Sequence, residues 1–175
     1  MKRRIVAFAF YLGIGVCLVL AAKVTTDYDH AVNFEQYRTY SWLKVQAGDP
    51  LWPDRIRSAV DSQLTKKGWM AVPAGGDADV SAFGSTREQP RLETFYTGLD
   101  GGWYWRGFGD GIATTDVQYT PVGTLVVDIF DGSTKKLIWR ASATDALSDK
   151  PEKNEKKLEK AVEEMFKHFP PKGKG

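Results

Sequence analysis

The chain has little of what most catalytic sites and crosslinked folds require. It contains one cysteine and two histidines in 175 residues. A single cysteine excludes an intramolecular disulfide, so packing alone must hold the fold. The two histidines, His30 and His168, are isolated and make a weak case for general-base catalysis. The sequence also lacks G-x-S-x-G, H-E-x-x-H and a phosphate-binding glycine loop. We therefore expect no catalytic residue, metal site or cofactor.

An excess of charge of one sign is also missing. The chain carries 24 lysines and arginines against 22 acidic residues. Three of the basic residues are Lys2, Arg3 and Arg4, so the chain beyond residue 22 has 21 basic and 22 acidic residues. A net charge near −1 argues against a nucleic-acid-binding surface.

Residues 1–22 have the pattern of an export segment. After Lys2, Arg3 and Arg4, the run from Ile5 to Ala22 carries no charge. The segment is interpreted either as a signal peptide cleaved near Ala22 or as an uncleaved membrane anchor, because the run is just long enough to cross a bilayer. Both interpretations place the following domain outside the cytoplasm, in the periplasm.

Cys17 offers another hypothesis for attachment. Lipoprotein leaders usually have a small residue directly before the lipidated cysteine, whereas Val16 stands there and further apolar residues follow. Lipidation of Cys17 and an ordinary apolar position within the leader both remain open.

Two helices are predicted beyond the leader. The first begins near Asp49, Pro50 and Pro53 and ends at Gly68, with apolar residues at every fourth position. The second has Asp149 as its N-cap in a capping box with Glu152 and ends before Pro170. Its apolar stripe predicts core positions at Leu158, Ala161, Val162, Met165, Phe166 and Phe169.

Alternating residues predict the strands of a single domain over 23–175. Candidates are 24–28, 39–43, 78–85, a strand containing Leu125, Val127 and Ile129, and a paired strand with an inward row of Leu137, Trp139, Ala141 and Ala143. Arg140 is expected on the opposite face. The order of elements predicts an α+β fold, with an antiparallel β-sheet and two α-helices packed on one face.

Several stretches resemble a known family. TDYD, YRTYSWL, GTLVVDIFD, LIWRA and LSDKPEKNEKK are similar to bacterial domain-of-unknown-function family 4136, over about Val24 to Pro171. The resemblance implies an envelope protein with a signal or lipoprotein leader. The family has no established activity, so the resemblance implies no catalytic residues.

The segment from Gly98 to Gly111 is the main candidate for binding. It is rich in glycine and contains five residues typical of contact surfaces: Trp103, Tyr104, Trp105, Arg106 and Phe108. We expect a loop joining strands near Phe95 and Gln118. Its aromatic residues could stack on sugar rings, lie among lipid headgroups or anchor a protein partner, and a loop folded back over its own domain is the fourth alternative.

Asp27 and Asp29 are candidates for a different function. Two residues apart on a strand, they would share one face and could bind a divalent cation or act as an acid and base pair. In a cell-wall glycan hydrolase, Asp27, Asp29 or Asp110 would be the acid and base. The alternative is an exposed strand edge that its charges protect from pairing.

Our main expectation is a non-enzymatic envelope domain for binding or assembly. A structural protein that uses the sheet edge near Val24 is a further alternative.

Overall fold

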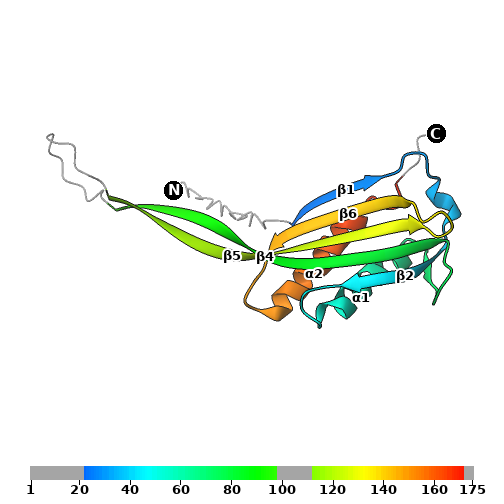
Figure 1. Ribbon diagram of the computed structural model, residues 1–175, viewed down its shortest axis with the longest axis horizontal. Coiled ribbons are helices and arrows are strands. Elements are labelled where there is room, and N and C mark those ends of the chain that lie inside the picture. The colour runs from blue at the N-terminus through cyan, green and yellow to red at the C-terminus, as the bar shows by residue number, and fades with distance from the viewer. Residues whose placement is uncertain (1–21, 98–111, 172–175) are drawn as a thin grey trace, which may run out of the picture.

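Six strands form one sheet in the order β1-β6-β5-β4-β2-β3. The computed structural model describes residues 22–97 and 112–171 (Figure 1). The elements are β1 (Lys23–Tyr28), a 3₁₀ turn (Phe34–Gln36), β2 (Thr39–Gln46), α1 (Trp52–Lys66), β3 (Met70–Ala71), β4 (Ala78–Thr97), β5 (Ile112–Asp131), β6 (Leu137–Ala146) and α2 (Pro151–Phe166).

The sheet is mixed, which corrects the expectation of a purely antiparallel one. The neighbouring strands β1, β6, β5 and β4 pair antiparallel, whereas β2 runs parallel to β4 and to β3. The reason is the connection: α1 follows β2 and returns the chain to the end of the sheet where β2 began. A crossover of this kind joins parallel strands. The fold class is α+β.

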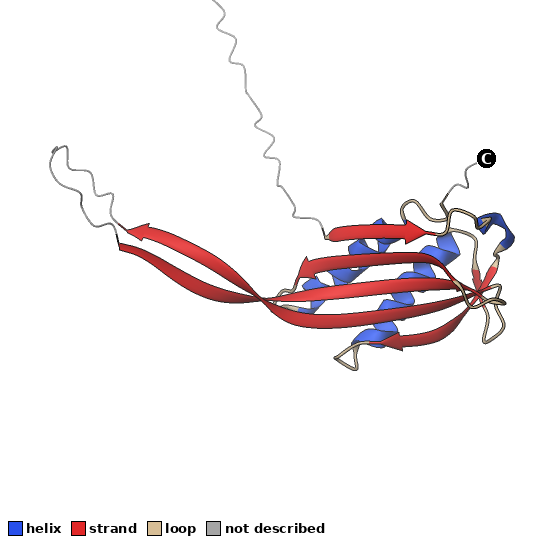
Figure 2. Cartoon of the chain, turned by 45° about the horizontal axis from the view of Figure 1, so that its top comes forward, coloured by secondary structure: helices blue, strands red, loops and turns tan. Residues whose placement is uncertain are grey.

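Both helices lie on the same side of the sheet, behind the strands in Figure 1 and Figure 2. Helix α1 buries Ile56, Val60 and Leu64, which recur at every fourth position as predicted. Alternate residues of the central strands meet them, including Val80, Val127 and Ile129. Every buried hydrophobic side chain described lies in the range from Phe34 to Phe169.

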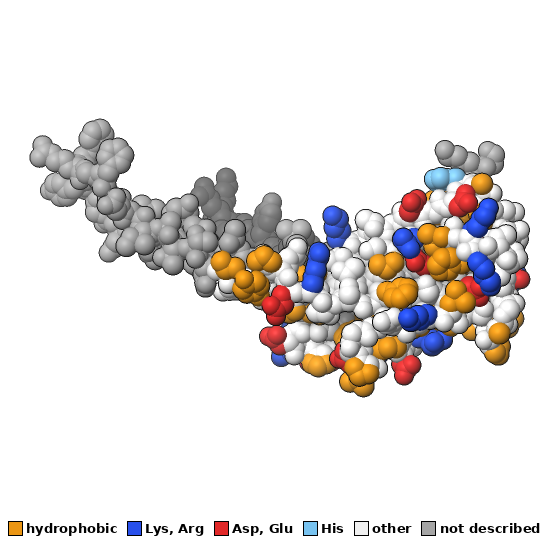
Figure 3. Space-filling view, in the orientation of Figure 1, with side chains coloured by type: hydrophobic (Ala, Val, Ile, Leu, Met, Phe, Trp, Pro, Cys, Tyr) orange, Lys and Arg blue, Asp and Glu red, His pale blue; other side chains and the backbone are white. Residues whose placement is uncertain are grey.

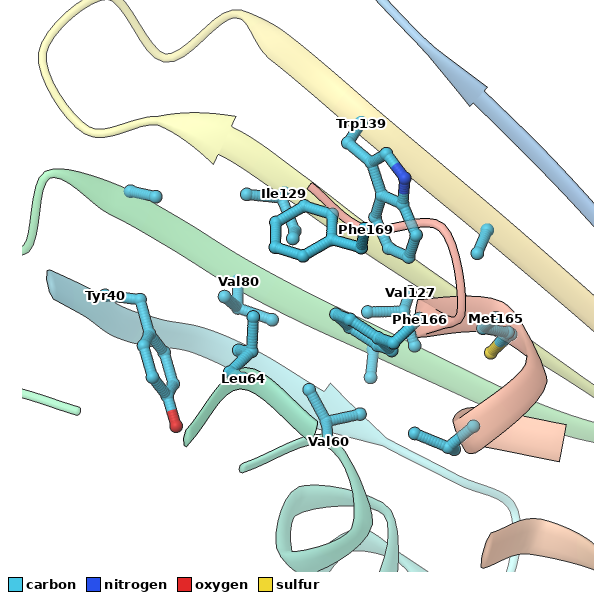
Figure 4. Close-up of a cluster of buried hydrophobic side chains, with 14 of the residues drawn as sticks. Tyr40, Val60, Leu64, Val80, Val127, Ile129, Trp139, Met165, Phe166 and Phe169 are labelled. Atoms are coloured by element: carbon cyan, nitrogen blue, oxygen red, sulfur yellow. The ribbon is translucent and has the colours of Figure 1, made fainter. Parts of the chain in front are cut away.

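An aromatic cluster closes the core beyond the end of α2. Phe169 lies 5.2 Å from Trp139 and 5.4 Å from Phe166, measured between ring centroids. Figure 4 shows these three rings gathered between the strands and the end of α2. The predicted stripe of α2 therefore does form core, and it extends past the helix to Phe169.

The ends of the helices follow the sequence only in part. Gly68 adopts the left-handed conformation, with φ +82°, directly after α1. The prediction that Asp149 caps α2 is wrong: Lys150 is the N-cap and makes no side-chain capping bond. Asn154 holds this turn instead, because its side chain accepts from Ser148 N and donates to Ser148 O, both at 2.7 Å. Neither described helix is long and apolar enough to cross a membrane.

A shift of register near the β5–β6 turn corrects a second detail. Trp139, Ala141 and Ala143 face the core as predicted, but Leu137 is exposed. The pairing shifts between Ile129 and Phe130, so the extra residue Ile138 is buried in place of Leu137.

Candidate functional site: the arm and the pocket at its base

Strands β4 and β5 continue far beyond the sheet. Pairing of β4 with β2 ends at Phe83, and pairing of β5 with β6 begins at Val122. Ten cross-strand pairs, from Glu88↔Pro121 to Thr97↔Ile112, lie outside those limits and have no other described strand beside them. We call these ten pairs the arm and the rest of the domain the body. At the usual rise per residue the arm is about 33 Å long, and Figure 1 shows it projecting from one end of the sheet.

Two glycines lie where the arm joins the body. A Cβ on Gly123 would fall 2.9 Å from Leu147 Cδ2, and one on Gly84 would fall 3.2 Å from Ile56 Cδ1. Glycine therefore lets both side chains approach the strand backbones. Figure 1 shows the strands crossing over each other here, as expected of a ribbon that has lost its neighbouring strands.

Prolines lie on both edges of the arm near its base. Pro90 is opposite Tyr119 and Pro121 is opposite Glu88. Because proline has no N–H, these pairs are the kind in which backbone groups point outward, away from the partner strand. Each edge therefore lacks a donor that an added strand would need, which protects the base of the arm from edge-to-edge pairing.

Large apolar side chains are exposed on the arm. Val117 is 44% exposed and Tyr119 is 65% exposed. They lie two residues apart and thus on one face of the ribbon. The same alternation leads along β5 to the core residues Leu125 and Val127, so the apolar face of the arm continues the face of the sheet that packs on the helices.

A pocket of about 410 Å³ lies on that face at the base of the arm. The ends of the sheet and the first turns of both helices form its walls, and we call it the base pocket. Its lining is mainly apolar and includes Trp52, Ile56, Leu125, Leu147 and Leu158. An apolar pocket next to an exposed apolar strand face is suited to binding a ligand or partner segment rather than to proton transfer.

The two basic residues that line the base pocket have acidic neighbours. The Arg55 guanidinium lies 5.4 Å from the Trp52 ring and 3.9 Å from Glu155 Oε1. Lys157 Nζ lies 3.4 Å from Asp145. These pairs form a polar rim around an apolar floor, as in many protein-binding sites.

The contact residues predicted in the segment 98–111, which we call the tip, lie outside the described residues. This applies to Trp103, Tyr104, Trp105, Arg106 and Phe108, and likewise to Cys17. The structure does show that strands β4 and β5 carry the chain to the segment 98–111 at the far end of the arm.

Asp27 and Asp29 lie at the other end of the body. Asp27 accepts a hydrogen bond from Tyr28 N and Asp29 accepts one from Ala31 N, both at 2.9 Å, so each carboxylate binds the backbone close to its own position in the chain. Through Arg140 and Asp128, Asp27 is in register with Ser81 of β4. About 50 Å of strand separates Ser81 from Thr97. The described end of the arm, at Thr97, is therefore far from this acid pair.

Sequence reasoning missed two buried carboxylates on the open face of the sheet, opposite the helices. Asp79 and Asp128 are 3% and 5% exposed. Arg140 donates two hydrogen bonds to Asp128, of 2.6 and 2.7 Å, which raise the pKa of the arginine. Lys135 and Ser41 bind Asp79. The pattern could have revealed the first pair, because Asp128 and Arg140 occupy outward positions of two strands that pair.

The open face has no cluster suited to metal binding. Figure 3 shows acidic, basic and apolar side chains interspersed there. Across residues 22–97 and 112–171, no three His, Cys, Asp or Glu side chains are grouped so that they could hold a metal ion. The two ion pairs hold adjacent strands together.

Comparisons with solved structures find similar folds. A PDZ domain protein from Parabacteroides distasonis ATCC 8503 has a TM-score of 0.59 and 16% identity over 89% of this chain and 37% of that one. The PelC dodecamer from Paraburkholderia phytofirmans has a TM-score of 0.49 and 14% identity, covering 83% and 94%. Lipoprotein GNA1162 from Neisseria meningitidis has a TM-score of 0.40 and 12% identity, covering 75% and 99%.

The likeness to the PDZ domain protein shows a shared fold only, and this chain spans little more than a third of its length. A comparison with curated proteins finds no match. The family comparison is more specific, because the model described as Domain of unknown function (DUF4136) matches residues 24–171. These limits agree with the range over which the sequence motifs resemble that family. The chain belongs to the DUF4136 family, whose function is unknown.

Proposed function

We propose that the protein is a non-enzymatic binding or assembly module of the cell envelope and that the arm is its contact element. The observation that carries this proposal is the arm itself: ten strand pairs without a neighbouring strand. A two-stranded ribbon is at best marginally stable in water. An arm of this length that exposes Val117 and Tyr119 gains stability when a partner covers its apolar face.

The envelope location rests on the N-terminal pattern. Residues 1–22 have the features of an export segment, either cleaved or kept as an anchor. Exported domains in the periplasm meet proteins, glycans and lipid headgroups. The tip residues Trp103, Tyr104, Trp105, Arg106 and Phe108 extend the proposed contact surface beyond the described part of the arm.

The non-enzymatic assignment rests on the character of the site. The base pocket has an apolar floor, and the basic residues of its rim, Arg55 and Lys157, lie beside carboxylates. The acid pair proposed for a glycan hydrolase lies at the other end of the body, with each carboxylate bound to a nearby backbone N–H. Binding is the function that this geometry supports best.

Removal of the arm tests the proposal. In the domain from Ala22 to Gly175, residues 90–119 are replaced by Asn-Gly, which keeps Gln89 opposite Thr120 as the closing pair. Sedimentation with isolated native envelopes is measured at about 0.5 M salt, where interactions between exposed charges are screened. We expect saturable binding by the intact domain and none by the shortened one.

Point variants then locate the contact. Val117→Ser with Tyr119→Ser removes the apolar face of the arm, and Trp103→Ala with Trp105→Ala changes the tip. Leu43→Ser with Met70→Ser is the matched control, since both residues are exposed on the body, at 56% and 64%. If the shortened domain binds envelopes as tightly as the intact one, the arm is not the contact element.

A further inference from the structure

A stripe of lysines runs along the outward face of α2. Lys153, Lys156, Lys157 and Lys160 occur at i, i+3, i+4 and i+7, which places them on one side of the helix. The opposite side is the one that packs into the core, through Ala161, Val162, Met165 and Phe166.

Most of this stripe is available to a partner. Lys153, Lys156 and Lys160 are exposed, and none of them forms an ion pair with a carboxylate of the described residues. Lys157 is half-buried and binds Asp145. Three lysines therefore present their charge to the surroundings from adjacent turns.

Four of the five acidic residues of α2 lie on a neighbouring flank. Glu152, Glu155, Glu159 and Glu163 occur at i, i+3, i+7 and i+11, and Glu155 faces Arg55 of α1. Glu164 lies on the lysine side in the last turn and pairs with Lys167. An ordinary solvated helix mixes the two signs along each face, as the open face of the sheet does in Figure 3. Over residues 152–160 of α2 the signs are segregated, although the charge of the whole domain is close to zero.

The end of α1 extends the basic surface. Lys67 Nζ lies 3.4 Å from the carbonyl oxygen of Lys167, just beyond the end of α2. Lys66 is exposed beside it. One hollow is bordered by residues of both helix ends and by the stripe. The basic surface thus spans both helices on the side of the molecule opposite the open face.

The N-terminal apolar run joins the domain beside this surface. Ala22, its last residue, packs against the core and borders the same hollow as Lys153, Lys157 and Lys160. The uncharged run of residues 5–22 therefore leads directly to the stripe. A hydrophobic segment and a basic surface at one point are the two signals that together hold a protein at a membrane.

We propose that the lysine stripe binds the anionic phospholipid headgroups of the membrane at which the N-terminal segment is inserted. Clustered lysines are attracted to a negatively charged bilayer surface, and the attraction falls off within a Debye length. Contact through the helices leaves the open face of the sheet away from the bilayer. This surface is separate from the arm and does not depend on the proposed function of the arm.

Vesicle flotation tests this proposal. The domain from Ala22 to Gly175 is used, because the apolar segment before it would bind any bilayer and the described buried residues all follow it. Vesicles of phosphatidylcholine alone are compared with vesicles containing phosphatidylglycerol. We expect binding to the anionic vesicles to be about ten-fold stronger or more at low salt, and the difference to disappear at about 0.5 M salt.

Two variants that each remove three positive charges distinguish the effect of the stripe from the effect of net charge. Lys153→Gln, Lys156→Gln and Lys160→Gln together should abolish the preference for anionic vesicles. Lys44→Gln, Arg87→Gln and Lys136→Gln remove three positive charges elsewhere and should keep it. Circular dichroism checks that both variants are folded.

Three results would overturn the proposal: equal binding to neutral and anionic vesicles, equal losses in the two variants, or retained binding by the stripe variant. The arm variant Val117→Ser with Tyr119→Ser should float like the unchanged domain. If this variant no longer floats with the anionic vesicles, the arm binds the lipid and the stripe does not. The vesicles contain no protein or glycan, so failure here leaves the envelope test of the arm unaffected.

Discussion

The same two strands have opposite surroundings along their length. Within the body, β4 and β5 bury Val80 and Val127 completely between the sheet and the helices. In the arm, β5 exposes Val117 and Tyr119 although the pairing with β4 continues without a break. Backbone pairing is therefore not what distinguishes the two regions. The difference is the burial of side chains, which supplies most of the favourable free energy of folding.

The largest expected effect comes from opening the core of the body. Phe166→Ala should lower the free energy of unfolding by about 3–5 kcal/mol, because it removes a buried ring and leaves a cavity beside Trp139. Urea unfolding measures the change. Tyr119→Ala in the arm is the paired variant and should stay within about 0.5 kcal/mol. Similar losses from both variants would mean that the arm is part of the folded core.

A close backbone contact in the body should give the next largest effect. A Cβ on Gly76 would fall 2.6 Å from the carbonyl carbon of Tyr40 and 2.7 Å from Ser41 N. Gly76→Ala should therefore cost about 1–3 kcal/mol, as overpacking usually does. Gly48→Ala is the control, since a Cβ there meets nothing within 4 Å. If Gly76→Ala unfolds at the same urea concentration as Gly48→Ala, this contact does not constrain the body.

The stabilisation provided at the end of the body opposite the arm should depend on pH. Hydrogen bonds from Ser133, from Thr134 and from Tyr37 lower the pKa of the Asp131 carboxyl below its usual range. The folded state thus favours the charged form, so this stabilisation is present above the ordinary aspartate pKa of about 3.9 and is lost as the pH falls toward the lowered value.

The measurement is the pH dependence of urea unfolding. Between about pH 5 and pH 2.5, Asp131→Asn should lose stability less steeply than the unchanged domain, even though it starts from a lower value. The effect should be modest because solvent screens this turn. Parallel slopes for the two proteins would show that Asp131 does not contribute to acid sensitivity.

The smallest effect on stability should come from the largest deletion. Replacing residues 90–119 with Asn-Gly should change the free energy of unfolding by only about 1 kcal/mol or less, because no other described strand lies beside the arm and Val117 and Tyr119 are exposed. Hydrogen exchange provides a second measurement: amides of the arm should exchange by local opening and those near Val127 by global unfolding. A large loss of stability on deletion would make the arm and body one cooperative unit.

Local chemistry made both helices predictable. Ile56, Val60 and Leu64 recur every fourth residue, and Gly68 ends the first helix for the reason expected. The cap at Asp149 was predicted wrongly because a capping box is only one way to satisfy the first turn, and Asn154 satisfies the preceding loop here.

The strands were less predictable because pairing joins residues far apart in the chain. Alternation placed Leu125, Val127 and Ile129 on the core face correctly. It could not show that β2 pairs parallel with β4, nor that the register shifts near Phe130 and buries Ile138 in place of Leu137. Alternation reports which face a side chain takes, but not which strand lies beside it.

In the candidate site, too, local features could be predicted and contacts between distant residues could not. The aromatic composition of 98–111 indicated a contact region and the flanking strands were expected, but the length of the arm was not. Pro90 and the weak alternation of β4 gave no sign of a continuous strand from Ala78 to Thr97. The base pocket could not be predicted, since it brings together residues of β4, β5, β6 and both helices.

The sequence by itself determined the leader pattern, the family, both helices and the inward rows of the central strands, because these depend on neighbouring residues and on the periods of helix and strand. Only the tertiary structure decided the mixed sheet, the ten unsupported pairs of the arm, the pocket at its base and the position of Ala22 beside the lysine stripe. Those features depend on which distant segments meet, and contacts of that kind are set by packing over the whole domain.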